Sequence, residues 1–252
     1  MAEGAGQVRP GVKHSTTGAH ALVIIPTYNE RENLPRLLDG LFAYLPDAHA
    51  LVVDDNSPDG TGQIADDRAR GDSRVRVLHR PGKQGLGKAY IAGFHQALLT
   101  EAQYIFEMDA DFSHDPKYLP LFMERIQHAD VVIGSRYVRG GGVTNWGFHR
   151  KLISSLGNTF ARVALNLRAR DCTAGYKCYR RSVLEALALD DIHSEGYAFQ
   201  VEMIYRCQRH GFRITEFPII FPDRVLGASK MSKKIIVEAL VFVFRARFGL
   251  VR

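Results

Sequence analysis

Short apolar runs recur through the first half of the chain, and stretches with a helical spacing of apolar residues separate them. The runs are continuous rather than alternating, which is typical of strands covered on both faces of a sheet. The expected strands span residues 21–25, 51–53, 74–78 and 104–108. The expected helices span residues 32–44, 63–69 and 87–100. This alternation predicts an α/β fold with a mostly parallel central sheet.

Each expected strand ends in polar residues. These polar clusters are 26–30, 54–57, 79–80 and 109–111. Ligands of open parallel sheets bind beyond the carboxyl ends of the strands. We therefore expect several of the clusters to line one cleft.

The second half is less regular, but it contains two basic amphipathic helices. A strand is expected over 130–133, a glycine run occupies 140–142, and the helices are expected over 151–167 and 233–248. A basic amphipathic helix can lie in a membrane interface. Alternatively, each helix packs on its own sheet and leaves a solvated basic edge. The presence of two such helices favours the interface.

Asp109-Ala110-Asp111 is the strongest candidate for metal chemistry. Side chains at i and i+2 of a strand share one side, so two carboxylates at a strand end can converge on one point. Mg²⁺ commonly takes one or two carboxylates together with water and substrate phosphate oxygens. The alternative is a solvated acidic turn that caps the next helix.

Composition limits the classes of partner. The 252 residues carry a formal net charge of +6, which fits an anionic partner such as nucleic acid, an acidic membrane or a phosphorylated substrate. No basic run interleaved with aromatic residues and no zinc-finger spacing is present, so nucleic acid is not expected. The three cysteines (Cys172, Cys178 and Cys207) lack a CxxC spacing and are expected to be reduced packing residues of a cytosolic chain.

Four motifs occur in order along the chain, at residues 23–34, 53–61, 108–114 and 133–137. Together they carry a resemblance to a known family. From about Leu22 to Lys234 the chain resembles dolichol-phosphate (polyprenol-phosphate) mannose synthases. These are inverting family 2 glycosyltransferases with a nucleotide-diphospho-sugar transferase (GT-A, Rossmann-like) fold. The resemblance implies metal-dependent transfer of mannose from GDP-mannose to a polyprenyl (dolichyl-type) phosphate, giving a β-linked product and GDP.

The resemblance also implies a set of site residues. GDP-mannose would be bound by Pro26, Tyr28, Glu30, Val53, Asp55, Asp109, Ala110, Asp111, Arg136, Arg224 and Lys230. The lipid phosphate would be bound by Arg136, Arg150 and Ser154. Asp109 and Asp111 would hold Mg²⁺ or Mn²⁺, and the catalytic residues would be these two together with Arg136, Arg224 and Lys230. A lipid phosphate is already anionic near neutral pH, so no general base is required.

Some motif positions stay open. Ser113 stands where some relatives have Gln, which puts a third metal or sugar contact in doubt. His114 is interpreted as a loop residue rather than a ligand. Asp171 and Glu202 could orient sugar hydroxyls, cap helices, or pair with Arg180 and Arg206. Gly85 and Gly87 fit a ligand turn or a tight strand-to-helix connection.

The expected organisation is a single domain at a membrane surface. Residues 1–20 are expected to form a flexible tail, 21–234 the catalytic domain, and 235–252 an amphipathic helix of the same domain. No transmembrane helix is expected, since the apolar stretch 235–244 is shorter than the ~20 residues a span requires. The predicted location is the cytoplasmic face of the membrane, where a separate membrane-anchoring subunit is possible.

Two other functions remain as alternatives. A polyprenyl-phosphate glucosyl or other hexosyl transferase that uses a UDP-sugar would need the same metal and phosphate residues. The stretch from Gly141 to Trp146 favours the mannose enzyme. A catalytically silent scaffold or membrane-binding subunit is less compatible with the intact acidic and basic motif residues.

Overall fold

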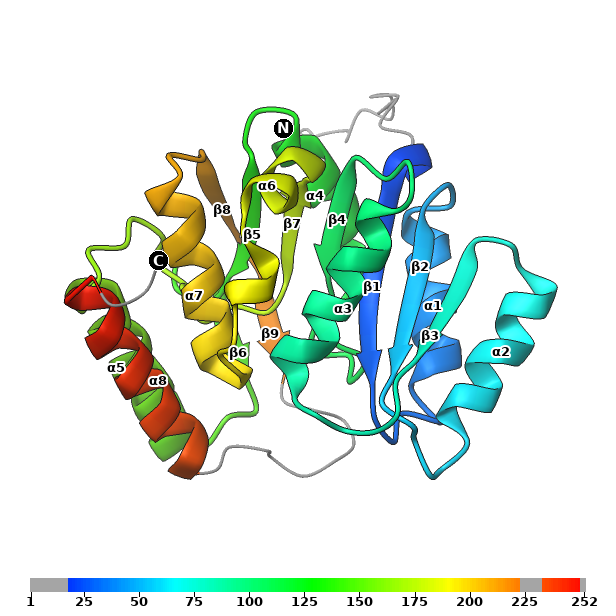
Figure 1. Cartoon of the computed structure of the whole chain (residues 1–252), viewed down its shortest axis with the longest axis horizontal. Helices are drawn as coiled ribbons and strands as arrows, with labels where there is room; N and C mark the ends of the chain where they lie inside the picture. The colour runs from blue at the N-terminus through cyan, green and yellow to red at the C-terminus, as the bar shows by residue number, and fades with distance from the viewer. Residues whose placement is uncertain (1–17, 223–232, 250–252) are drawn as a thin grey trace, which may run out of the picture.

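The computed structural model describes residues 18–222 and 233–249. The first half alternates strands and helices as the sequence predicts (Figure 1). After the short 3-10 helix η1 (Gly18–His20), its elements are β1 (Ala21–Thr27), α1 (Leu34–Tyr44), β2 (His49–Asp54), α2 (Thr61–Gly71), β3 (Val75–His79), α3 (Leu86–Leu98) and β4 (Tyr104–Glu107).

The second half contains more elements than the sequence analysis predicts. Its strands are β5 (Val131–Ser135), β6 (Gly142–Thr144), β7 (Lys177–Arg180), β8 (Ile214–Pro218) and β9 (Ile220–Pro222). Its helices are η2 (Pro116–Tyr118), α4 (Leu119–Ile126), α5 (Phe148–Ala164), α6 (Arg181–Ala186), η3 (Leu189–Asp191), α7 (Gly196–Arg209) and α8 (Lys233–Arg247). Only β5, α5 and α8 are among the expected elements.

The main sheet has the strand order β3-β2-β1-β4-β7-β5-β8. All neighbouring pairs are parallel except those of β7, which runs antiparallel to both β4 and β5. A second, two-stranded sheet pairs β6 with β9. The prediction of an α/β fold with a mostly parallel sheet is therefore confirmed.

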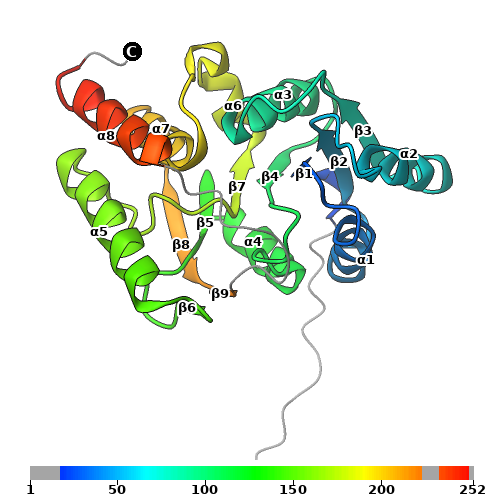
Figure 2. The same cartoon turned by 90° about the horizontal axis from the view of Figure 1, so that it is seen from below.

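Helices cover both faces of the main sheet, which explains the continuous apolar runs. In β1, Ile24 belongs to a core cluster that includes residues of α3 and α7, whereas Ile25 belongs to a second cluster that includes residues of α1 and α4. Figure 2 shows α3, α6 and α7 on one face and α1 and α4 on the other. Both side chains are fully buried, so alternate residues of one strand supply two separate cores.

The expected helix 151–167 is displaced toward the N-terminus. Helix α5 begins at Phe148, after Gly147 at its N-cap, and ends at Ala164. Asn166 has a φ of 52°, a left-handed conformation that cannot continue the helix. Periodicity indicates the existence of this helix, but local backbone conformation sets its ends.

The apolar stripe of α5 faces outward. Leu156 is 60% exposed and Val163 69% exposed, so this stripe does not pack on the sheet, contrary to one of the two interpretations above. Helix α8 lies beside α5 and packs on α7 (Figures 1 and 2). It buries Phe242 and Val243 but exposes Phe244. Within the described residues, no helix has the length and apolarity needed to cross a membrane.

Candidate active site

A cavity of about 530 Å³ opens at the carboxyl ends of β1, β2 and β4. Most of the candidate residues that the structure describes line it. They are Pro26, Tyr28, Glu30, Asp55, Asp109, Ala110, Asp111, Arg136 and Arg150. The structure thus brings together residues that are more than 120 positions apart in the chain. Arg224 and Lys230 lie outside the described residues.

One wall of the cavity follows β1 and β2. Lys83 Nζ lies 4.3 Å from the ring centroid of Tyr28, and Arg80 Nη1 donates to Asp55 Oδ1 at 2.6 Å. This combination of an aromatic face, carboxylates and cations is suitable chemistry for a nucleotide. Sequence reasoning missed Lys83, because a lysine in a loop has no distinguishing pattern.

Val53 and Asp54 have structural roles instead. The Val53 side chain is fully buried in the core and does not line the cavity. A contact between Val53 and a ligand would therefore have to involve its backbone. Asp54 accepts hydrogen bonds from the hydroxyls of Thr27 and Ser57 at 2.9 and 2.6 Å. It organises the turn that presents Asp55.

The two carboxylates of the Asp-x-Asp motif lie in a loop rather than on a strand. Strand β4 ends at Glu107, and Phe112, next to the motif, has a φ of 60°. The geometric argument from strand alternation is therefore wrong in detail. Both carboxylates nevertheless line the cavity.

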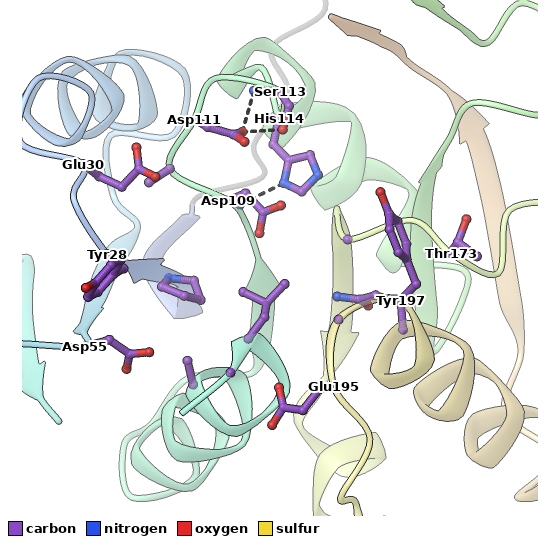
Figure 3. Close-up of a pocket in the computed structure, with 18 of the residues that line it drawn as sticks. Tyr28, Glu30, Asp55, Asp109, Asp111, Ser113, His114, Thr173, Glu195 and Tyr197 are labelled. Atoms are coloured by element: carbon purple, nitrogen blue, oxygen red, sulfur yellow. Dashed lines mark hydrogen bonds between the residues drawn. The ribbon is translucent and has the colours of Figure 1, made fainter. Parts of the chain in front are cut away.

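Hydrogen bonds hold this loop in place. Tyr90 OH donates to Asp109 Oδ1 at 2.9 Å, and the Asp109 backbone N–H donates to His114 Nδ1 at 2.8 Å. Both the backbone N–H and the hydroxyl of Ser113 donate to Asp111 Oδ1. Figure 3 shows the bonds made by His114 and Ser113. Burial lowers the pKa of His114, so its neutral ring serves as a loop support, as the sequence analysis predicts.

The donor set fits a hard divalent cation. Residues 18–222 and 233–249 contain no group of three or more His, Cys, Asp or Glu side chains that could hold a metal ion. A pair of carboxylates is enough for a cation that takes its other ligands from water and a diphosphate. Gly175 lies in the cavity wall close to this pair. A Cβ atom at that position would be 3.7 Å from Asp109 Oδ2.

Arg136 is held by a buried carboxylate. Its Nε and Nη2 atoms donate to Asp171 at 2.8 Å each, and Nη2 also donates to Thr173 Oγ1 at 2.8 Å. Burial alone would raise the pKa of Asp171, but the charge and hydrogen bonds of Arg136 outweigh it and lower that pKa. Asp171 therefore pairs with Arg136 and not with Arg180, the ion-pair partner that was one of the alternatives expected for it.

The basic end of α5 forms the next part of the wall. Arg150 Cζ lies 4.0 Å from the ring centroid of Trp146, and both residues line the cavity. Ser154, one turn further along, does not line the cavity, and its hydroxyl is 2.9 Å from Tyr137 OH. Of the two α5 residues expected at the lipid phosphate, the structure brings Arg150 to the cavity.

The opposite wall comes from α7 and the segments before it. Figure 3 shows Thr173, Glu195 and Tyr197 across the cavity from Tyr28, Glu30 and Asp55. Gln200 also lines this wall, whereas Glu202 pairs with Arg206 at 2.7 Å, which was one of the roles expected for it. Sequence reasoning missed Glu195 and Tyr197, because only the fold brings them to the cavity.

Glu195 also explains the glycine turn. Its Oε2 accepts the backbone N–H of Gly87 at 2.8 Å, at the start of α3. A Cβ on Gly85 would lie only 2.2 Å from this oxygen. The glycine is required so that a carboxylate from the opposite wall can reach the end of α3.

A buried ion pair lies behind the loop that carries the motif. Lys177 Nζ is 3.5 Å from Glu107 Oε2, and both side chains are fully buried. Lys177 also donates to Gln200 Oε1, and Tyr179 OH donates to Glu107 Oε1 at 2.9 Å. Burial raises the pKa of Glu107 and lowers that of Lys177. This network connects the core below Asp109 to the cavity wall at Gln200.

Comparisons with known proteins show which family the chain resembles. The sequence profile described as "Glycosyl transferase family 2" matches residues 22–188. An undecaprenyl-phosphate mannosyltransferase from Micrococcus luteus is 53% identical over 224 residues, which cover 89% of this chain and 92% of that protein. A polyprenol monophosphomannose synthase from Mycolicibacterium smegmatis is 49% identical over 221 residues, which cover 87% of this chain and 83% of that protein.

A solved structure shares the fold. Glucosyl-3-phosphoglycerate synthase from Mycobacterium tuberculosis, in complex with Mn²⁺, UDP and glucosyl-3-phosphoglycerate, superposes with a TM-score of 0.67. The match covers 97% of this chain and 87% of that chain at 17% sequence identity. At this identity the likeness shows the fold alone, which is a GT-A glycosyltransferase fold.

Proposed function

Because the chain belongs to glycosyl transferase family 2, among the polyprenyl-phosphate mannosyltransferases, we propose that it transfers mannose from GDP-mannose to a polyprenyl phosphate. The observation that carries the proposal is that one cavity contains three kinds of group. They are the Asp109 and Asp111 carboxylates, the wall at Tyr28 and Asp55 that suits a nucleotide, and the cations of Arg136 and Arg150. A diphosphate donor and an anionic acceptor can meet there.

The proposed reaction is a direct displacement. A phosphate oxygen of the acceptor forms a bond to the anomeric carbon, and the bond from that carbon to the diphosphate breaks, so GDP leaves with the electron pair. Attack from the face opposite the leaving group inverts the anomeric centre, giving a β-linked product from an α-linked donor. The acceptor is already anionic, so the reaction depends on alignment and charge stabilisation.

Each part of the cavity has a proposed role in this reaction. Tyr28, Glu30 and Asp55 bind the nucleoside, and Asp109 and Asp111 would hold Mg²⁺ or Mn²⁺. When bound, the metal neutralises charge on the leaving diphosphate. Arg136 and Arg150 bind the acceptor phosphate. Arg224 and Lys230 remain proposed phosphate contacts on the basis of the sequence.

The donor is tested by parallel assays. The purified enzyme is incubated with a short polyprenyl phosphate and Mn²⁺, together with either GDP-mannose or UDP-glucose. We expect turnover with GDP-mannose and a β-linkage in the product by NMR. Turnover only with UDP-glucose would overturn the choice of donor in favour of the hexosyltransferase alternative.

The metal role is tested with matched carboxylate variants. Asp109→Asn should lose most of the transfer activity and most of the Mn²⁺ binding, because a neutral amide is a weaker ligand. Asp67→Asn removes an exposed carboxylate of α2 that pairs with Arg70, and should change neither. If Asp109→Asn kept full activity in a purified preparation, the metal mechanism would have to be abandoned.

We further propose that the enzyme works as a peripheral protein at the cytoplasmic face of a membrane. The exposed apolar side chains of α5 and α8 support this location. Arg150, a cavity residue, lies in the first turn of α5, so a lipid acceptor in the interface would be near the cavity. A separate anchoring subunit is a further possibility for the same surface.

A further inference from the structure

Tyr90 holds one oxygen of a candidate metal ligand from inside the core. It lies in α3, its side chain is fully buried, and its hydroxyl donates to Asp109 Oδ1 at 2.9 Å. The ring stacks on Phe199 of α7, with the ring centroids 5.9 Å apart and the planes at 3° to each other. Because a closely packed ring has little freedom to turn, the position of the Tyr90 hydroxyl is fixed by two helices.

The backbone of Asp109 is held as well. Its N–H donates to His114 Nδ1 at 2.8 Å, and the His114 ring stacks on Tyr176 with the centroids 4.8 Å apart. The second carboxylate oxygen, Oδ2, lies beside Gly175, where a Cβ atom would be 3.7 Å away, and both Asp109 and Gly175 line the cavity. Hydrogen bonds at the N–H and at Oδ1 therefore leave Oδ2 as the oxygen on the cavity side.

The number of oxygens that a carboxylate offers affects the choice of cation. Mg²⁺ requires a nearly ideal octahedron of oxygens, whereas Ca²⁺ takes about six to eight oxygens in a flexible shell and accepts both oxygens of one carboxylate. Mn²⁺ also occurs in octahedral oxygen sites. Hydrogen bonds to a ligating carboxylate orient it. A carboxylate that offers one oxygen, because the other accepts a hydrogen bond, therefore suits a small octahedral cation.

We propose that Tyr90 is a positioning residue that limits Asp109 to one coordinating oxygen, and that the site thereby favours Mg²⁺ or Mn²⁺ over Ca²⁺. This inference rests on the metal role proposed for Asp109. It extends that role, because it names a residue that sets the selectivity among divalent cations. Ser113 engages Asp111 Oδ1 through two donors, so each carboxylate of the motif has one oxygen held by the protein.

Metal binding is measured without turnover. Mn²⁺ is added to the enzyme with GDP, and in parallel with UDP, and the EPR signal of free Mn²⁺ is followed while Mg²⁺ or Ca²⁺ is added as a competitor. A sample with nucleotide and no enzyme corrects for the metal that the nucleotide binds alone. For the wild type, we expect Mg²⁺ to displace bound Mn²⁺ at a lower concentration than Ca²⁺ does.

A variant removes the hydroxyl and keeps the stacked ring. In Tyr90→Phe we expect the Kd of Mg²⁺ to rise about 10-fold, the lower end of the range for residues that orient metal ligands. The Kd of Ca²⁺ should rise less, because the released carboxylate can use both oxygens for this ion. The control is Tyr205→Phe, which removes a hydroxyl that donates to the backbone carbonyl oxygen of Ala246 at 3.2 Å, and it should change neither Kd. Thermal unfolding checks the fold of both variants.

The two Kd values discriminate between a positioning role and a packing role. A shift of preference from Mg²⁺ toward Ca²⁺ in Tyr90→Phe alone would support the inference. An equal change in both Kd values, or no change, would overturn it, because a general loss of packing affects the two ions alike. Wild-type enzyme that binds Ca²⁺ as tightly as Mg²⁺ would also overturn it, and this measurement requires no variant.

The same experiment separates this inference from the proposed function. If the wild type failed to use GDP-mannose but showed the expected metal preferences, the proposed donor would fail and the role of Tyr90 would stand. If the wild type bound no Mn²⁺ with either nucleotide, the proposed metal site and the inference about Tyr90 would both fail.

Discussion

Arg136 illustrates how a single residue in this cavity is fixed by its partners. The guanidinium is almost fully buried, and Asp171 accepts from its Nε and Nη2 atoms and from its backbone N–H. The pair is close to electrically neutral, so Arg136 offers the cavity a directed set of donors. The remaining nitrogen, Nη1, takes no part in these bonds.

The first prediction concerns this buried pair. Asp171→Asn leaves a buried cation without its counter-charge, which should lower the free energy of unfolding at neutral pH by about 3–5 kcal/mol. Urea unfolding measures the loss. The control is Asp39→Asn, whose carboxylate is 65% exposed and pairs with Arg68, and which should change stability by less than about 1 kcal/mol.

The same variant should show a distinctive pH dependence. The pKa of Asp171 is lowered in the folded protein, so its contribution is fully present above the unfolded value near ~3.9. That contribution is lost as the pH falls through the lower folded pKa. The stability difference between wild type and Asp171→Asn should therefore shrink in acid, and a constant difference would contradict the assigned ion pair.

At the scale of the element, α5 and α8 form a pair whose apolar residues face in two directions. Helix α8 buries Phe242, Val243 and Ala246 against the rest of the molecule. The outward residues of the pair include several large apolar side chains that are 45–74% exposed. They are Phe148, Leu152, Ile153, Leu156, Phe160, Val163, Leu240, Val241, Phe244 and Phe248. Exposed apolar side chains that are concentrated on two neighbouring helices favour an interaction site.

The second prediction tests this surface with a matched leucine pair. Leu156→Gln should reduce binding of the enzyme to anionic liposomes in a flotation assay, because it removes apolar area from the interface-facing stripe. Leu99→Gln changes a leucine that is 79% exposed beyond the end of α3, and should leave flotation unchanged. Neither variant should alter the unfolding midpoint appreciably, since both side chains are exposed.

Two results would change this interpretation. Equal loss of flotation in both variants would mean that binding is not specific to α5. No flotation of the wild type, with or without anionic lipid, would indicate that a partner protein covers the surface and supplies the anchor.

At the scale of the whole molecule, the cavity depends on both halves of the chain. The first half supplies the carboxyl ends of β1, β2 and β4, and the second half supplies Arg136, Arg150 and the wall at α7. Strand β7 joins the halves, because it pairs with both β4 and β5. Separation of the two halves would therefore dismantle the cavity.

The third prediction uses the cysteines as reporters of this cohesion. Cys172, Cys178 and Cys207 are free and fully buried, and they lie before β7, in β7 and in α7. Burial raises the pKa of all three thiols, to about 12 for Cys172 and Cys207. Because the thiolate is the reactive form, a thiol reagent should not modify the native enzyme.

The measurement is thiol modification against denaturant concentration. All three thiols should become reactive together, at the midpoint of the unfolding transition seen by circular dichroism. Modification of one thiol in native buffer would show that its region opens independently of the rest of the sheet.

Features that depend on local pattern and on the order of motifs could be predicted before the fold was known. Continuous apolar runs such as 21–25 indicated strands covered on two faces, and ordered motifs indicated the family. These signals are local, because burial on both faces and helical periodicity are visible within a few residues. The candidates Asp55, Asp109 and Arg136 could be predicted because they lie within these ordered motifs.

Features that depend on contacts between distant residues became visible only in the folded chain. Strand β7 has no local signal for its antiparallel pairing, and Glu195 reaches Gly87 from 108 positions away. The pairing of Asp171 with Arg136 and the burial of Val53 were likewise invisible in the sequence. Each of these depends on which side chains share one desolvated space, a property that the folded chain alone defines.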